Sequence, residues 1–351
     1  MDCSTAGCPT RHHDRFDNAS IREAFDLYIS NPKTCVVRYG PIEDWDVGGV
    51  TNMSQLFQFA ESFNCDLSRW NVCNVTDMSY TFCGAALFNC DLSRWNVKNV
   101  TDMSCMFREA TAFEGSGLSG WKVRNVSDMS EMFLFASAFN CDISEWDVRN
   151  VTDMSCLLQH TAINCDLSEW DVKNVDNMRG MFRGAVHFDC DLIKWDVSNV
   201  TDMSCMFQGA ESFKGRGVSK WNVSSATNMR CMFEDAIAFD CDLSEWNQYA
   251  DWDECDVEKM LYEATAFHGD LSGWTPPEIV SQKEFKLHLG LHAGHRSPGW
   301  MWGKCAKYAR HRSVACWWYE KACSRSYRPG GVGQKRDRDD LMADFGSLME
   351  E

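Results

Sequence analysis

Residues 95–113 read W-N-V-K-N-V-T-D-M-S-C-M-F-R-E-A-T-A-F, and residues 195–213 read W-D-V-S-N-V-T-D-M-S-C-M-F-Q-G-A-E-S-F. The same pattern recurs every 24 to 28 residues along the chain, and each copy begins at a tryptophan. These tryptophans are Trp45, Trp70, Trp95, Trp121, Trp146, Trp170, Trp195, Trp221, Trp246 and Trp274. A fixed period of this length is typical of a repeat array, in which each unit buries its apolar side against its neighbours.

Each unit carries the signals of one short strand and one short helix. Trp95 and Val97 alternate at the period of a strand. Thr101 and Asp102 favour a helix start, with a threonine cap and a carboxylate in the first turn. The apolar residues that follow have the spacing i, i+3, i+4, i+7 and i+10 of an amphipathic helix; they are Met103, Met106, Phe107, Ala110 and Phe113. We therefore predict an α/β repeat solenoid, leucine-rich-repeat-like, with one short strand and one short helix per unit of about 25 residues.

The repeats divide the chain into five segments. We expect a polar N-terminal tail at 1–17, an N-terminal cap of a helix plus a strand at 18–44, and nine to ten units at 45–275. They are followed by a basic, aromatic C-terminal cap or docking region at 276–328 and a flexible tail at 329–351. In the cap, Ser20-Ile-Arg-Glu23 has the pattern of a capping box. Pro32 is expected to end this helix, and Cys35 to Tyr39 to form the strand.

The recurring pattern W-D-V-S-N-V-T-D-M-S-x-M-F-x-x-A-x-x-F-N-x-D-L-S resembles the BspA-like surface-protein repeat, a family of unassigned function. The resemblance covers about residues 18–275, and the motif recurs nine times. It implies a leucine-rich-repeat-like array used for adhesion or protein–protein contact, and it implies no catalytic residue.

Equivalent residues of successive units form columns along the array. The tryptophan column is followed two residues later by a valine column, so we expect it to be a core ladder rather than a sugar-stacking platform. The asparagine column is expected to bond the turn backbone of neighbouring units; it comprises Asn74, Asn99, Asn125, Asn150, Asn174 and Asn199. The aspartate column favours Asx-turns, with calcium binding as the alternative; it comprises Asp66, Asp91, Asp142, Asp166, Asp191 and Asp242.

The chain has 19 cysteines, an odd number, and they recur mostly at two places in the unit. The first column is expected to be a small, buried turn position: Cys65, Cys90, Cys141, Cys165, Cys190 and Cys241. The second is expected to be partly exposed: Cys105, Cys156, Cys205 and Cys231. Neither column has C-x-x-C spacing, so we predict no metal or other cofactor in the array and mostly reduced thiols.

Net charge and hydropathy limit the classes of partner and the cellular location that we expect for this chain. The net charge of −17 disfavours nucleic-acid binding. The chain has no run of 18 apolar residues, so we expect no membrane insertion. Residues 1–16 lack the apolar core of a signal peptide, which favours an intracellular location.

The C-terminal region departs from this acidic composition. Residues 278–338 hold 13 Lys and Arg against four Asp and Glu, interleaved with aromatic residues. The interpretations are a cap with a solvated tail, a docking segment for a partner or for the acidic array itself, and a nucleic-acid-binding arm. A zinc site from Cys305, His311, Cys316 and Cys323 is a further alternative, although its spacing matches no standard motif.

No nucleophile–base pair, P-loop, G-x-G-x-x-G or H-E-x-x-H pattern occurs, so we predict that the chain is not an enzyme. The leading hypothesis is a scaffold that binds a protein partner of unknown identity through variable positions on the strand side of the array. These are Arg69, Arg94, Lys98, Arg124, Glu145, Arg149, Glu169, Lys173, Lys194, Lys220 and Glu245. The alternatives are a coat-like or matrix-like structural protein, which would self-associate, and a surface adhesion protein.

Overall fold

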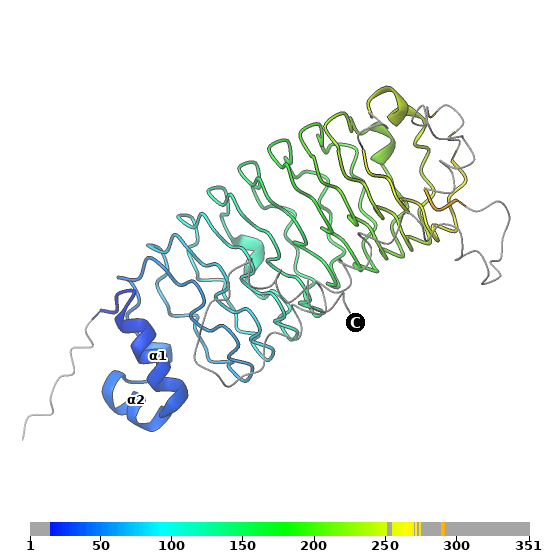
Figure 1. Cartoon of the computed structure of the whole chain (residues 1–351). Helices are drawn as coiled ribbons and strands as arrows, with labels where there is room; N and C mark the ends of the chain where they lie inside the picture. Colours follow the sequence, from blue (N-terminus) through cyan, green and yellow to red (C-terminus); the bar gives the residue numbers. More distant parts are fainter. Residues whose placement is uncertain (1–14, 251–254, 270, 272–273, 275–288, 292–351) are drawn as a thin grey trace, which may run out of the picture. The chain divides into compact units, whose positions relative to one another are not determined.

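The computed structural model describes residues 15–250, 255–269, 271, 274 and 289–291. These residues belong to one compact unit of the chain, residues 1–292. Within it each repeat forms one rung, and successive rungs are stacked side by side from cyan to yellow in Figure 1. Apart from 289–291, the predicted basic region and flexible tail lie outside the described residues.

The predicted strand and helix of each repeat are both wrong, so the fold is not the α/β solenoid that the sequence favours. The described helices are α1 (Ser20–Ser30) and α2 (Pro32–Tyr39), which precede the repeats, and the short 3-10 helices η1 (Ile42–Asp44), η2 (Leu118–Gly120), η3 (Val218–Lys220) and η4 (Ser244–Gln248). In the described residues the only β-pairing is a series of isolated parallel bridges, one per pair of rungs. They join equivalent Asp or Asn residues, from Asn52–Asp77 to Asn228–Asp256.

The segment that was expected to be helical is a series of four-residue turns. In residues 103–110, each turn is closed by an amide bonded to the carbonyl three residues earlier, as from Met106 to Met103 at 3.2 Å. The intervening amides donate instead to the next rung, as from Cys105 to the Ser130 carbonyl at 2.9 Å. Cys105 and Glu109 have φ of 55° and 59°, which no right-handed helix allows.

Two physical reasons favour turns over helices here. A helix of eight residues is unstable by itself, because nucleation costs more than so few hydrogen bonds return. In the stack, the amides that would be left unpaired at helix ends bond to the next rung, and the pattern is repeated at every rung. The apolar residues with helical spacing are nevertheless all buried, because a series of turns also directs them to one side.

The prediction of a tryptophan core ladder is confirmed. Every repeat tryptophan is at most 4% exposed. The indole rings of Trp121 and Trp146 are stacked, with centroids 6.5 Å apart and planes 5° apart. Each indole from Trp70 onwards also donates a hydrogen bond to a carbonyl of the previous repeat, as from Trp146 to Leu118 at 2.9 Å. The valine two residues later is buried in the same way, as at Val148.

The predictions for the asparagine and aspartate columns are also confirmed. The amide of Asn99 donates to the Cys73 carbonyl of the previous rung at 2.7 Å, and the other asparagines repeat this bond. The carboxylate of Asp166 accepts from the amide of Ser168 at 2.9 Å, which is an Asx-turn, and this bond lowers the pKa of Asp166. Thr101 caps no helix, since its amide and hydroxyl both donate to the Thr76 carbonyl.

The N-terminal cap differs from the prediction in two ways. α1 begins at Ser20 as expected and buries Ile21, but its N-terminal amides are bonded by the Asp17 carboxylate rather than by a capping box. Pro32 does not precede a strand; it is the first residue of α2, where its missing amide hydrogen costs nothing. Asn31 caps α2 by accepting from the Thr34 amide at 3.1 Å.

α1 also covers the first rung. In the turns of each rung, amides donate hydrogen bonds to carbonyls of the following rung. The equivalent carbonyls of the first rung therefore have no preceding rung to accept from. Arg22 on α1 donates to one of them, the Ser54 carbonyl, at 2.8 Å and to the Asn52 side chain at 2.9 Å. Asn18 accepts from the amides of Thr51 and Asn52.

We expect Arg22→Met to destabilise the first rung by about 1.5–3 kcal/mol, because a charged donor to a partly buried carbonyl is lost. Chemical denaturation measures the change, and hydrogen exchange should locate it in residues 20–60. Lys33→Met, on the exposed start of α2, is the control and should be close to neutral. An equal effect of both substitutions would contradict the capping role of Arg22.

Candidate functional site

The turn segments of nine rungs together form one continuous side of the stack, here named the tandem-turn face. Its segments are 55–59, 80–84, 105–109, 131–135, 156–160, 180–184, 205–209, 231–235 and 259–263. Each segment begins and ends at a residue with positive φ. The first of these positions is the inner turn column and the last is the outer turn column.

Positive φ is maintained at both columns mostly without glycine. Of the 18 positions, only Gly84, Gly180, Gly184 and Gly209 are glycines. The others are Gln55, Phe59, Tyr80, Cys105, Glu109, Glu131, Phe135, Cys156, His160, Cys205, Cys231, Asp235, Lys259 and Glu263, and among the described residues no non-glycine outside these columns has positive φ. A left-handed backbone costs a non-glycine residue about 1–2 kcal/mol. Side chains are therefore kept at positions where glycine would relieve backbone strain.

The inner turn column brings thiols, a phenol and ion pairs together. The neighbouring Cys105 thiol and burial raise the pKa of Tyr80. Cys105 Sγ lies 3.6 Å from the Glu131 carboxylate, which also pairs with Arg108. Burial raises the pKa of the Cys105 thiol to about 12. Cys105 and Cys231 are buried and Cys156 and Cys205 half-buried, so the expectation of partial exposure holds for only two of the four.

A second cluster surrounds Cys205 and Cys231 on consecutive rungs. The neighbouring Cys231 thiol lowers the pKa of Cys205, and Arg183 and Arg179 lower it further against the effect of burial. The neighbouring Cys205 thiol, burial and the nearby Glu234 carboxylate raise the pKa of Cys231. Consecutive rungs of the inner column thus place two thiols near both basic and acidic side chains.

The outer turn column is exposed wherever it carries a side chain. The rings of Phe135 and His160 on consecutive rungs are stacked, with centroids 4.9 Å apart and planes 7° apart. The His160 ring in turn covers Gly184, where an added Cβ would lie 2.2 Å from Nδ1, and the Phe59 ring covers Gly84 in the same way. Flat rings therefore lie along the face, each over the next rung.

The first cysteine column lies elsewhere on the rungs, and its environment differs. Three of its six members are buried and three half-buried, so the predicted burial holds in part. The Sγ atoms of Cys90 and Cys190 accept from the amides of Leu67 and Leu167 on the previous rung, at 3.3 and 3.2 Å. The sulfur is thus part of the inter-rung bonding.

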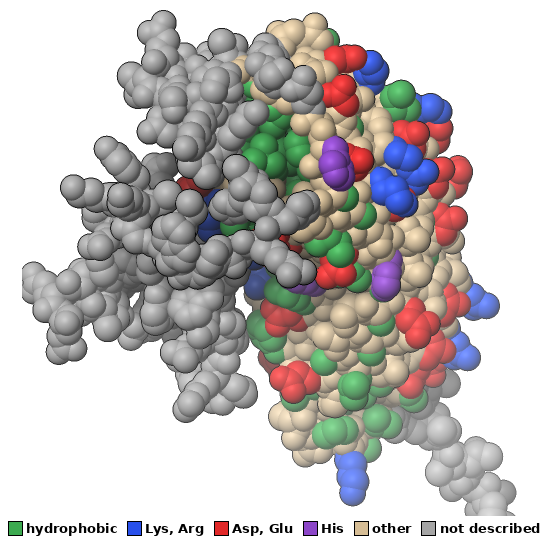
Figure 2. All heavy atoms as spheres, turned by 90° about the vertical axis from the view of Figure 1, so that its right-hand side faces the viewer, with side chains coloured by type: hydrophobic (Ala, Val, Ile, Leu, Met, Phe, Trp, Pro, Cys, Tyr) green, Lys and Arg blue, Asp and Glu red, His purple; other side chains and the backbone are tan. Residues whose placement is uncertain are grey.

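All eleven residues predicted to bind a partner are exposed, but they lie beside the tryptophans in turns or, at Lys220 and Glu245, in the 3-10 helices η3 and η4 rather than on a strand. Most of them are paired with acidic or basic residues of the array. The pairs are Arg69–Asp44 at 2.7 Å, Lys194–Glu169, Lys220–Glu245 at 2.5 Å, Arg149–Asp147 at 2.7 Å, Arg124–Asp147 at 4.0 Å and Lys173–Asp171 at 3.9 Å. Arg94, Lys98 and Glu145 have no ion pair among the described residues. Figure 2 likewise shows basic and acidic side chains next to one another on the described surface.

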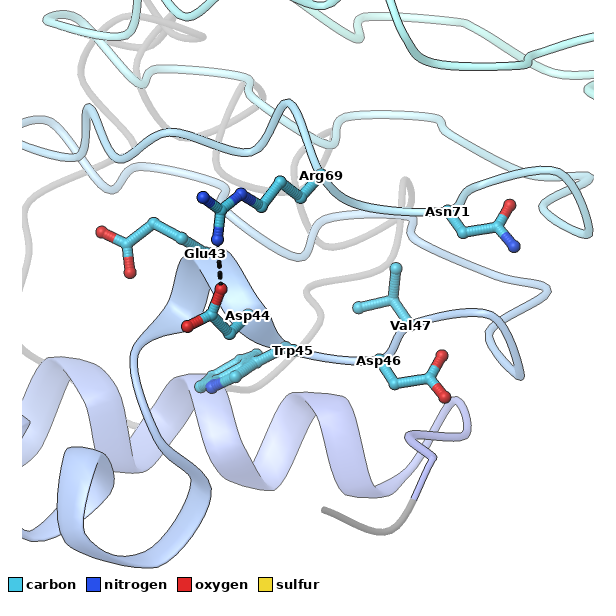
Figure 3. Close-up of a pocket in the computed structure, with 7 residues that line it drawn as sticks. All are labelled: Glu43, Asp44, Trp45, Asp46, Val47, Arg69 and Asn71. Carbon is cyan, nitrogen blue, oxygen red and sulfur yellow. Dashed lines mark hydrogen bonds and ion pairs between the residues drawn. The ribbon is translucent and has the colours of Figure 1, made fainter. Parts of the chain in front are cut away.

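One hollow adjoins these residues at the first rung. It has a volume of about 300 Å³ and is lined by Glu43, Asp44, Trp45, Asp46, Val47, Arg69 and Asn71. Figure 3 shows Arg69 reaching across it to Asp44, while Asp46 points away. The described residues contain no cluster of three or more potential metal ligands. α1 and α2, the longest helices in the described part of the chain, are too short to cross a membrane.

Sequence reasoning identified the inner turn column only through its cysteines and overlooked the outer one. The signal was available, because aligning the units shows both positions varying within the otherwise constant motif M-S-x-M-F-x-x. The recurrence of glycine at Gly84, Gly184 and Gly209, inside a stripe with helical spacing, was the further indication.

Comparison with known proteins identifies the repeats. No curated protein matches the chain. The family model described as "Mycoplasma protein of unknown function, DUF285" matches three times, at residues 27–133, 113–216 and 188–286. These matches cover the N-terminal cap and the stacked rungs, and well over half of the chain. The chain therefore belongs to the DUF285 family of repeat proteins.

Proposed function

We propose that this chain is a non-enzymatic scaffold that binds a protein partner through the tandem-turn face. The main observation in support is that 14 of the 18 positions with positive φ on this face have a side chain, where glycine would be less strained. The residues beneath them are nearly constant between rungs, whereas these residues change from aromatic to acidic to basic. Variable side chains on a constant backbone are how repeat proteins form specific extended surfaces.

The chemistry of the face suits a protein partner. The outer turn column contains exposed aromatic rings, at Phe59 and Phe135, and exposed carboxylates, at Glu109 and Glu263. Mixed aromatic and charged contacts are characteristic of protein interfaces. The resemblance to BspA-like surface repeats supports the same class of function, and with it adhesion to another protein. The paired charges beside each tryptophan stabilise the rungs against one another and offer fewer uncompensated groups to a partner.

A test compares two triple variants of the full chain in capture experiments from its own cell extract. The face variant is Glu109→Gly, Phe135→Gly and His160→Gly, in which glycine suits the backbone and should leave the melting temperature unchanged or higher. The corner variant is Arg94→Ser, Lys98→Ser and Glu145→Ser, at exposed positions beside the tryptophans. We expect a saturable partner whose affinity falls at least tenfold for the face variant and little for the corner variant.

The other outcomes distinguish the alternatives. Loss of binding in the corner variant alone would place the interface at the residues predicted from the sequence. Stoichiometric self-association without a saturable partner would favour the coat-like or matrix-like function. Binding that neither triple variant weakens would contradict the proposed use of the tandem-turn face.

A further inference from the structure

Hydrogen bonds between rungs run in one direction along the tandem-turn face. On each rung except the last, four alternate amides donate to four carbonyls of the following rung. In the last such pair the donors are Met229, Cys231, Phe233 and Asp235, and the acceptors are Asp256, Glu258, Met260 and Tyr262. The stack is therefore polar: its first rung has four carbonyls with no rung before them, and its last rung has four amides with no complete rung after them.

At the last rung, one of these four amides has an acceptor in the described part of the chain. The Leu261 amide donates to the Leu289 carbonyl at 2.8 Å, and Leu289 is fully buried. Gly290, with φ of 88°, then turns the chain against the backbone of Tyr262, where an added Cβ would lie 2.7 Å from the Tyr262 Cα. The other three amides have no acceptor among the described residues; they are those of Val257, Lys259 and Glu263. Residues 289–291 thus close one donor position of the four.

The first rung has the complementary arrangement. Its four carbonyls are those of Asn52, Ser54, Leu56 and Gln58. Arg22 on α1 donates to the second of them at 2.8 Å, and the other three accept no hydrogen bond from the described residues. α1 also packs against this rung, with the Phe25 ring centroid 4.8 Å from that of Phe57. Each end of the stack is thus covered by a short segment that bonds one polar backbone group of four.

From this complementarity we infer that the two ends of the stack are docking surfaces for a second copy of this chain, held closed by α1 and residues 289–291. Unpaired backbone groups at an exposed edge are a template for pairing with another chain. A row of donors cannot pair with a second row of donors, so copies can join only head to tail. Such a contact leaves one open end on each side and builds an open chain of copies. The inference is independent of partner binding by the tandem-turn face.

The two caps obstruct different bonds of this contact. In the register that the array uses throughout, the end amides at 257–263 of one copy face the end carbonyls at 52–58 of the next. Arg22 occupies the second carbonyl of its row, and Leu289 occupies the third amide of the other row. Together the caps remove two of the four bonds, and α1 in addition covers the first rung with its apolar side chains.

The test opens each end of the full chain by a separate substitution. Gly290→Val should lift residues 289–291 off the last rung, because valine disfavours φ of 88° and its Cβ would overlap the Tyr262 backbone. Ala24→Arg should displace α1 from the first rung, because Ala24 is fully buried. If either variant fails to fold, Leu289→Asp and Ile21→Asp place a charge at fully buried positions of the same two caps and repeat the test.

Sedimentation velocity over a range of concentrations measures the association. We expect each opening variant alone to sediment like the wild-type chain, because its single open end has no complementary end to meet. An equimolar mixture of the two should form 1:1 dimers, and the double variant should form longer assemblies. The matched controls are Gly120→Val, where an added Cβ has no atom within 4 Å, and Ile29→Arg on the exposed side of α1; their mixture should not associate.

Amide hydrogen exchange of the wild-type chain, resolved by NMR, needs no variant. The amides of Lys259 and Glu263 should exchange at least tenfold faster than their equivalents on the previous rung, Cys231 and Asp235, and should become protected in the dimers. The inference is overturned if the mixture of folded opening variants does not associate, if one of them associates alone as strongly as the mixture, or if Lys259 and Glu263 are as protected in the wild-type chain as Cys231 and Asp235.

Discussion

Trp146→Ala is expected to destabilise the array by about 3–5 kcal/mol, the range for removing a large, fully packed aromatic side chain. Trp146 is 3% exposed, its ring is stacked with that of Trp121, and its indole donates to the Leu118 carbonyl at 2.9 Å. The substitution therefore leaves a cavity and also an unpaired carbonyl in the previous repeat. Trp146→Phe is the matched control, because it keeps much of the volume and loses the hydrogen bond.

The region of the array that Trp146→Ala destabilises is as informative as the size of the change in stability. Each rung bonds only to its neighbours, so stability is approximately a sum of rung terms and nearest-neighbour terms. Hydrogen exchange should show protection lost mostly in residues 118–175, and much less in the rungs next to α1. Equal loss of protection at every rung would contradict this nearest-neighbour coupling.

The core of the stack could be predicted from the sequence because burial depends on the repeated pattern alone. Trp146 and Val148 recur with constant spacing, and a residue that recurs among variable neighbours is most simply explained by a shared core. The same holds for Asn99 and Asp166, whose short polar side chains bond locally to turn backbone.

The secondary structure itself could not be predicted, because the apolar spacing is compatible with two backbone conformations, a helix and a series of turns. Residues at i, i+3, i+4 and i+7 lie on one side of a helix, and a series of four-residue turns directs them to one side as well. Only the sign of φ at positions such as Cys105 and Glu109 separates the two, and neither residue type favours positive φ. What selects turns is cooperative bonding between rungs, which no single unit encodes.

The candidate site was predicted incompletely for the same reason. The cysteines of the inner turn column were evident, but the placement of Cys205 and Cys231 on adjacent rungs beside the same charged groups depends on the register of the two rungs. The outer turn column escaped notice because Phe135 and His160 would be unremarkable surface residues on a helix. Their stacking along the face follows only from the left-handed backbone beneath them.

The last prediction concerns the two repeats that contain an extra residue, 113–118 and 213–218. Each accommodates the insertion through a glycine with positive φ that lies against the previous rung. At Gly117 φ is 90°, and an added Cβ would lie 2.2 Å from the Ser93 amide nitrogen and 2.6 Å from an oxygen of the Asp91 carboxylate. Gly217 repeats this arrangement, with φ of 84° and the Ile193 amide nitrogen at 2.2 Å.

We expect Gly117→Ala to destabilise the array by about 2–5 kcal/mol, because a left-handed alanine costs about 1–2 kcal/mol and a forced backbone shift about 1–3 kcal/mol more. Gly120→Ala, three residues away, is the matched control: Gly120 has no positive φ, and a Cβ added there would have no atom within 4 Å. Denaturant titration of both variants measures the difference. Since the clash is with backbone of the previous rung, hydrogen exchange should locate the loss at residues 91–95 as well as at 115–121. If the two variants were equally stable, the insertion would not be held against the previous rung, and the same conclusion would apply to Gly217.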